Sequence, residues 1–146
     1  MKRIFVVLGI AMLFVARIVC AYDMSSAVVF WVAVDDKTSK TSSVIQIWQN
    51  PKNLNYYGKI YKVFSNDAQK TVDRRNPMVG KVIITDMKYQ NGQYVGGWVF
   101  DPRDGSKYHA RMRVTEGGHL LSLRGYIGMP LLGRTAQWQR VVSMRP

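Results

Sequence analysis

Residues 94–126 read YVGGWVFDPRDGSKYHARMRVTEGGHLLSLRGY, and this stretch contains three strand-like segments separated by two turn signals. The first turn signal combines aspartate, proline and glycine at 101–105, and the second is the glycine pair at 117–118. Between the turns, apolar and polar residues largely alternate, which is the period of a β-strand with one buried face. The stretch therefore predicts three consecutive antiparallel strands.

Turn signals with a similar spacing continue toward both ends of the chain. The strongest is Asn91-Gly92, because both residues tolerate the positive φ angles of a two-residue hairpin turn. We expect one short helix at 66–75 and eight strands, at 27–35, 43–49, 56–64, 81–89, 94–101, 106–115, 119–126 and 136–144. An open eight-stranded meander would expose two edges, and closure removes them. The sequence therefore predicts an all-β protein, a small antiparallel up-and-down β-barrel whose interior is filled by side chains or holds one small ligand.

Pairing across the two turns assigns the two faces of the central strands. With Asp101 opposite Ser106 and Glu116 opposite His119, the buried face takes Val95, Val99, Tyr108, Met112, Val114, Leu121 and Leu123. The other face interleaves aromatic, basic and polar side chains: Tyr94, Trp98, Phe100, His109, Arg111, Arg113, Ser122, Arg124 and Tyr126. The same pairing, carried back through Asn91-Gly92, leaves Met87 on the wrong face. A bulge at Gly96-Gly97 would correct this.

The second face has the composition of an anion site. In this register Trp98 lies opposite His109, His109 opposite Tyr126, and Arg111 opposite Arg124. Two facing arginines repel unless an anion lies between them, and guanidinium groups beside aromatic rings suit a carboxylate or phosphate. The candidate ligand-binding residues are Trp98, His109, Arg111, Arg124 and Tyr126, with Arg134 and Trp138 near the last strand. The alternative is a solvated outer face whose arginine stems cover the rings.

The first 21 residues have the layout of a secretory signal peptide, with a basic start, an apolar run at 4–16 and small residues around Cys20. We expect a helical signal peptide cleaved after Ala21, a single β-barrel domain at 22–146, and a periplasmic or secreted protein that is not integral to a membrane. An uncleaved anchor is one alternative, although the apolar run is short for a membrane span. Lipidation of Cys20 is another.

The charge balance favours acidic partners. The chain has 21 Lys and Arg against 9 Asp and Glu, a net charge of +12, and three of the basic residues precede the expected cleavage site, which leaves +9. A basic field raises the association rate with anions. We expect a small anionic or fatty-acid-like ligand, or an anionic envelope surface, as the partner. Export argues against nucleic acid.

Motifs for catalysis and metal binding are missing from the sequence. There is no G-x-S-x-G elbow, phosphate loop or dinucleotide fingerprint, and His109 and His119 lack partners at metal-ligand spacing. We therefore expect a non-catalytic protein without cofactor or metal. Two alternatives remain open: a small hydrolase or isomerase that uses Asp73 or His109, and a structural envelope protein with a filled barrel.

Five motifs follow one another in an order that resembles a known bacterial family. They are Gly58-Lys59-Ile60-Tyr61, Asp73-x-x-Asn76-Pro77, Gly96-Gly97-x-Val99-Phe100-Asp101-Pro102-x-Asp104-Gly105-x-x-Tyr108, Leu123-Arg124-Gly125-Tyr126-Ile127-Gly128 and Leu132-Gly133-Arg134-Thr135-x-x-Trp138-x-Arg140. The chain resembles the bacterial exported domain of unknown function 2147 family. The resemblance implies an exported calycin-like (lipocalin-like) β-barrel, and it supplies no catalytic residues.

The resemblance also implies structural roles. In calycins a tryptophan at the barrel base is packed by a basic residue of the last strand, which implies a pair of Trp31 and Arg140, although Val29 replaces the glycine that usually opens the family motif. Turn-forming roles are expected for Asp73, Asn76, Pro77, Asp101, Pro102 and Gly105. Arg124-Gly125-Tyr126 resembles the Arg-x-Tyr carboxylate clamp of fatty-acid-binding proteins. It would act as a clamp if it faced a cavity and as a docking patch if it faced solvent.

Overall fold

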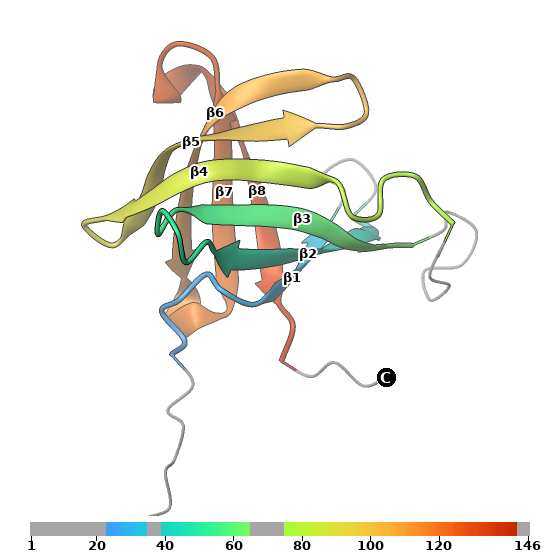
Figure 1. Ribbon diagram of the computed structural model, residues 1–146, viewed down its shortest axis with the longest axis horizontal. Coiled ribbons are helices and arrows are strands. Elements are labelled where there is room, and N and C mark those ends of the chain that lie inside the picture. The colour runs from blue at the N-terminus through green and yellow to red at the C-terminus, as the bar shows by residue number, and fades with distance from the viewer. Residues whose placement is uncertain (1–22, 35–38, 65–74, 143–146) are drawn as a thin grey trace, which may run out of the picture.

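The computed structural model describes residues 23–34, 39–64 and 75–142. These residues form eight strands and two 3₁₀ turns, in the order β1 (Phe30–Val34), β2 (Thr41–Gln49), β3 (Tyr56–Val63), β4 (Val82–Gln90), β5 (Gln93–Asp101), β6 (Ser106–Thr115), η1 (Glu116–Gly118), β7 (Leu120–Tyr126), η2 (Pro130–Leu132) and β8 (Gly133–Arg140). Each strand pairs antiparallel with its sequence neighbours, and β1 pairs with β8, so the barrel is closed (Figure 1). The predicted all-β, up-and-down barrel is confirmed.

Three expectations fall on residues outside the described ranges. The signal peptide at 1–21 is one, and the role of Asp73 is another. The third is the short helix at 66–75, of which only Arg75 is described, in a turn.

Strand boundaries differ from the prediction mainly at the two ends of the barrel. β1 begins at Phe30 instead of residue 27, because the preceding residues cross the base of the barrel. There the buried backbone N–H of Ala27 donates a hydrogen bond to the Tyr94 hydroxyl at 2.9 Å. β8 spans Gly133–Arg140 instead of 136–144, so the last strand begins earlier and ends at Arg140.

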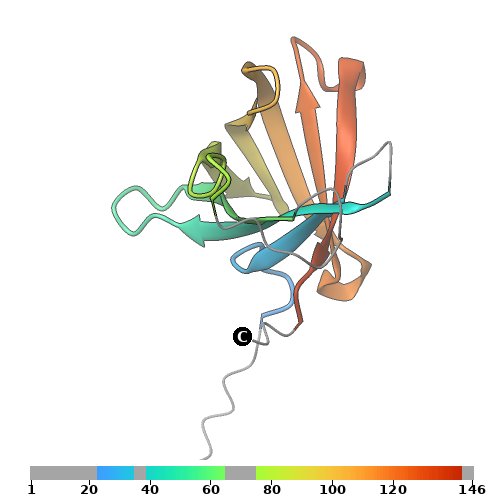
Figure 2. The same cartoon turned by 90° about the vertical axis from the view of Figure 1, so that its right-hand side faces the viewer.

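The core is built from apolar side chains of all eight strands. Those with no exposure include Trp31, Ile84, Met87, Met112 and Leu121. On β6 and β7 the predicted buried face is confirmed, since Met112 lies opposite Leu123 and both are buried. At the base the strands close around this core, while β5 to β8 fan out toward the other end (Figure 2).

A bulge in β5 decides which side chain enters the core there. The pairing runs as predicted from Asp101 opposite Ser106, but it then shifts so that Tyr94 lies opposite Met112. Tyr94 is therefore buried, and the placement of Tyr94 on the arginine face and of Val95 in the core was wrong. The physical reason is the bulge at Gly96, where φ is +77°, and β4 has a second positive φ of +56°, at Asp86, in the stretch that pairs with this part of β5.

Arg140 closes the base of the barrel, in the pairing that the family resemblance implies. Its guanidinium carbon lies 4.6 Å from the ring centre of Trp31. The same guanidinium donates hydrogen bonds to the carbonyl oxygens of Met24 at 2.9 Å, of Ser26 at 2.7 Å and of Gly118. One charged side chain thus joins the segment before β1, the η1 turn and the last strand.

The expected turn residues that the structure describes do form turns. The Asp101 carboxylate accepts the Arg103 backbone N–H at 3.0 Å and pairs with the Arg103 guanidinium at 2.7 Å. Hydrogen bonds from that guanidinium lower the pKa of the Asp101 carboxyl. Pro102 lies within this turn, and Gly105 completes it with φ of +77°. Asn76, followed by Pro77, accepts the Met78 N–H at 3.0 Å before β4.

Candidate functional site

The arginine–aromatic face of β5 to β7 points to solvent. On β6, His109, Arg111 and Arg113 are exposed, whereas the alternating Ala110 and Met112 have no exposure. We call the outward-facing set the basic face; its members are Trp98, Lys107, His109, Arg111, Arg113, Arg124 and Tyr126. Because this face lies outside the barrel, Arg124 and Tyr126 do not form a clamp inside it.

A row of three stacked rings, one from each of β5, β6 and β7, forms part of the basic face. The ring centres of Trp98 and His109 are 4.0 Å apart, and those of His109 and Tyr126 are 5.7 Å apart. The interplanar angles are 29° and 26°, so both pairs are stacked. Lys107 places its ammonium 4.5 Å from the Trp98 ring centre. Three strands therefore present flat rings beside a positive charge.

An arginine pair lies next to the rings, at the next outward-facing positions of β6 and β7. Arg111 on β6 is opposite Arg124 on β7, as the predicted register requires. Arg124 donates hydrogen bonds to the carbonyl oxygens of Pro130 and of Leu131, the latter at 3.1 Å, and to the Thr135 hydroxyl at 2.7 Å. In the part of the chain that the structure describes, Arg111 has no such partner. One arginine of the pair is therefore fixed against a loop, and the other is available.

Acidic side chains are almost missing from this side of the barrel. The four strands β5 to β8 contain one carboxylate, Asp101, which lies at the end of β5 and is paired with Arg103. The positive charge of the basic face is therefore not neutralised by its own strands.

Two of the seven candidate residues lie elsewhere. Trp138 is 6% exposed and lies opposite Leu121 inside the barrel, so its side chain belongs to the core. Arg134 lies opposite Gly125 at the end of the barrel near η2, and it is exposed. The structure thus brings together Trp98, His109, Arg111, Arg124 and Tyr126, but not Arg134 or Trp138.

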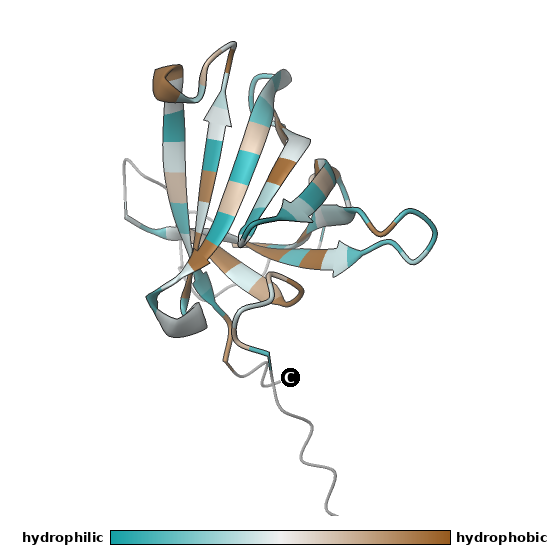
Figure 3. Ribbon diagram, turned by 90° about the vertical axis from the view of Figure 1, so that its left-hand side faces the viewer, coloured by the Kyte–Doolittle hydropathy of each residue, from teal (hydrophilic) through white to brown (hydrophobic). Residues whose placement is uncertain are grey.

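The loop between β7 and β8 was not identified from the sequence. It contains four large apolar side chains with high exposure: Ile127 at 69%, Met129 at 60%, Leu131 at 82% and Leu132 at 70%. Figure 3 shows this region, with η2 among the most hydrophobic parts of the ribbon. The signal that could have revealed it is a non-alternating apolar run, IGMPLL, between two strands that alternate.

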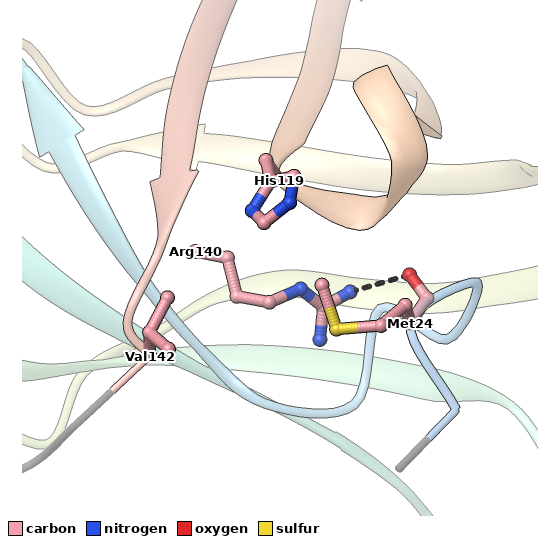
Figure 4. A pocket seen from close by; sticks show the side chains of 4 residues that line it. All are labelled: Met24, His119, Arg140 and Val142. Atoms are coloured by element: carbon pink, nitrogen blue, oxygen red, sulfur yellow. Dashed lines mark hydrogen bonds between the residues drawn. The ribbon is translucent and has the colours of Figure 1, made fainter.

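A pocket of about 280 Å³ lies at the base of the barrel and is lined by Met24, His119, Arg140 and Val142 (Figure 4). Its charged member, Arg140, holds backbone carbonyls at this place. We therefore assign the pocket to the closure of the barrel base.

The match to a family model covers the whole barrel. Residues 30–140, from the first residue of β1 to the last of β8, match the family described as "Uncharacterized protein conserved in bacteria (DUF2147)". The chain belongs to this family. The family resemblance inferred from the motifs is thereby confirmed. A search of curated proteins found no match.

A solved structure supports the same architecture for this DUF2147 barrel. It is described as "Protein HP1028 from the human pathogen Helicobacter pylori belongs to the lipocalin family". The superposition has a TM-score of 0.61 with 17% sequence identity, and it covers 80% of this chain and 83% of that one. At this identity the likeness shows the fold, so the lipocalin-like prediction is confirmed.

Two further observations concern the described residues of the DUF2147 chain. They contain no group of three or more histidine, cysteine, aspartate or glutamate side chains placed to hold a metal ion. None of their helices has the length and hydropathy needed to cross a membrane.

Proposed function

We propose that this protein is an exported, non-catalytic binding protein that recognises an anionic group, a phosphate or carboxylate carried on a flat or apolar body, at its basic face. The observation that carries the proposal is the facing pair of Arg111 and Arg124 beside the stacked rings of Trp98, His109 and Tyr126. Like charges that face each other across two strands destabilise the sheet unless a counter-charge lies between them.

The arrangement suits an anion for two reasons. Arg124 is held by Pro130, Leu131 and Thr135, so one guanidinium is pre-oriented and loses little freedom on binding. Arg111 is exposed, and its planar fork can approach the same anion from the neighbouring strand. The adjacent rings offer a flat apolar surface for the rest of the ligand.

The environment of His109 favours binding over catalysis. A general base needs an orienting group, commonly a carboxylate. The neighbours of His109 across the strands are Trp98 and Tyr126, and the β6 and β7 strands contain no carboxylate. The packed interior also favours the outer face, since a fatty-acid-like ligand inside would have to displace side chains such as Met112 and Leu121, which have no exposure.

Titration with phenyl phosphate tests the anion site. We expect shifts of the β5 to β7 amide signals in NMR spectra and a binding isotherm by calorimetry. Arg111→Ala should weaken the affinity about tenfold, because it removes a charge-assisted hydrogen bond. Lys52→Ala, which removes an exposed charge in the β2–β3 loop, is the matched control and should leave the affinity unchanged. Equal binding of phenyltrimethylammonium, or an unaffected Arg111→Ala variant, would refute the proposal.

Export is tested separately, and its support is the signal-peptide layout of the first 21 residues. Mass spectrometry of the protein from fractionated cells should find a chain beginning at Tyr22 in the periplasm or medium. An uncleaved chain in the cell interior would overturn this part of the proposal.

A further inference from the structure

The β7–β8 loop forms an apolar projection at the fanned end of the barrel. We call residues 127–132 the tip. Its side chains Ile127, Met129, Leu131 and Leu132 are 60% to 82% exposed. Exposed apolar residues normally occur singly on a soluble protein, and a contiguous group marks an interaction site. Four within six consecutive residues therefore require a partner.

The tip has a defined conformation. The Leu132 N–H donates to the Met129 carbonyl and the Met129 N–H to the Ile127 carbonyl, both at 3.0 Å. The Arg124 guanidinium, on β7, donates hydrogen bonds to the carbonyls of Pro130 and Leu131. These hydrogen bonds fix the backbone of the tip while its apolar side chains stay exposed. The tip therefore loses little conformational entropy when it binds a partner.

Positive charge and amphipathic rings surround the tip. Arg124 lies three residues before Ile127, and Arg134 lies two residues after Leu132. At the rise of a β-strand, two residues correspond to about 7 Å. Tyr126 directly precedes the tip and stacks through His109 on Trp98, next to Lys107. No carboxylate occurs between Ser106 and Thr115 or between Leu120 and Arg140.

We propose that the tip inserts into an anionic phospholipid bilayer, with the basic face and Arg134 at the level of the headgroup phosphates. This inference rests on the proposed function and names the anion as a lipid headgroup. Apolar insertion combined with basic charge is the pair of signals that peripheral membrane attachment requires. Tyrosine and tryptophan favour the boundary between headgroups and hydrocarbon, where one end of the ring is apolar and the other wet.

A bilayer suits this surface better than a folded protein partner. A stable protein interface uses about 20–30 residues on each side. The tip is a projection of six residues. The basic residues near it, Arg124, Arg134 and Lys107, have no acidic side chains among them on β6 to β8. A bilayer can enclose a small projection from every side and supplies phosphates at the same depth around it.

Quenching by brominated lipids tests where the protein inserts. The vesicles contain phosphatidylcholine and phosphatidylglycerol with brominated acyl chains. The wild type has four tryptophans, so each variant is compared with it: Leu131→Trp should increase the quenched fraction of the fluorescence, whereas Leu54→Trp should not. Leu54 is the matched control, because it is 64% exposed in the β2–β3 loop. Because the two variants differ only in the position of the added tryptophan, another segment that contacts the vesicles would affect both variants equally. No quenching at position 131 overturns the proposal.

Vesicle flotation tests the energetic contribution of the tip. Replacing Leu131 and Leu132 by serine should lower the partition coefficient on phosphatidylglycerol-containing vesicles about tenfold or more, and Leu54→Ser should not change it. Circular dichroism checks that each variant is folded. If the double variant partitions as the wild type does and still binds phenyl phosphate, insertion of the tip is refuted and the proposed function still stands. Equal partitioning of the wild type on pure phosphatidylcholine refutes the role of the anionic headgroup.

Discussion

Arg140 lies over the indole of Trp31 at the base of the barrel, with its guanidinium carbon 4.6 Å from the ring centre. The two residues come from the last and the first strand, which pair with each other and close the barrel. Trp31 has no exposure, and its indole N–H donates to the Ala27 carbonyl at 2.9 Å. The contact therefore links the closure of the barrel by β1 and β8 to the segment that crosses its base.

Replacing Arg140 by alanine should reduce the free energy of unfolding by about 2–4 kcal/mol. The change removes the donor of the Met24, Ser26 and Gly118 carbonyls and uncovers Trp31. Arg140→Lys should lose part of this stability, because one ammonium cannot reproduce the planar fork. Urea unfolding followed by tryptophan fluorescence measures both variants. A loss below about 1 kcal/mol for the alanine variant would contradict the role of Arg140.

Replacing Gly97 by alanine should destabilise the barrel by about 2–4 kcal/mol. A Cβ at this position would lie 2.8 Å from the Met87 nitrogen and still closer to the Thr85 carbonyl oxygen, so β4 and β5 would have to separate. Gly92→Ala is the control: φ is +76° there, but a Cβ meets no atom within 4 Å. The control should cost only about 1 kcal/mol of left-handed backbone strain. Equal thermal shifts in the two variants would disprove close packing at Gly97.

Tyr94→Phe should lower stability at neutral pH by about 1–2 kcal/mol, because the Ala27 N–H loses its acceptor in a buried place. Burial raises the pKa of the Tyr94 hydroxyl above its usual value of 10.0. A raised pKa in the folded state gives stability that is present below the unfolded pKa and lost as pH rises through the folded pKa. The wild type should therefore lose its advantage above pH 10, and the two unfolding curves should converge there. A constant difference at all pH values would contradict the buried hydroxyl.

The two facing arginines should respond differently to alanine substitution. Arg124→Ala should cost about 1–2 kcal/mol and accelerate hydrogen exchange at Met129 and Leu132, because the loop carbonyls lose their donor. Arg111→Ala should change stability by less than about 0.5 kcal/mol, because it removes an exposed side chain that faces a like charge. Equal losses in the two variants would show that Arg124 does not support the loop.

The sequence predicted the barrel and the pairing of β5 to β7 because turn chemistry sets the register of a hairpin. Asp101 to Gly105 and the Gly117-Gly118 pair fixed two registers, and these placed Trp98, His109 and Tyr126 in one row. The alternation then separated the core face from the basic face. Local signals were sufficient there because each strand contacts its neighbour in the chain.

Where local signals failed, a distant contact was decisive. The side of Tyr94 depends on positive φ angles at both Gly96 and Asp86, and the sequence suggested only the first. Trp138 enters the core because it lies opposite Leu121 of β7 and Ala33 of β1, which are both buried. The loop contacts of Arg124 require η2 to fold back against β7 and β8, which no short motif specifies.

The bonds of Arg140 to Met24 and Ser26 bring both described ends of the chain to one pole of the molecule. η2 lies at the other pole and ends eight positions before Arg140 along the chain, about 25 Å of strand. A fusion protein, affinity handle or solid support joined directly at either described end would thus leave the β7–β8 loop unobstructed. If that loop sits on a bilayer, the described ends at Asp23 and Val142 lie on the side of the barrel that faces away from the bilayer.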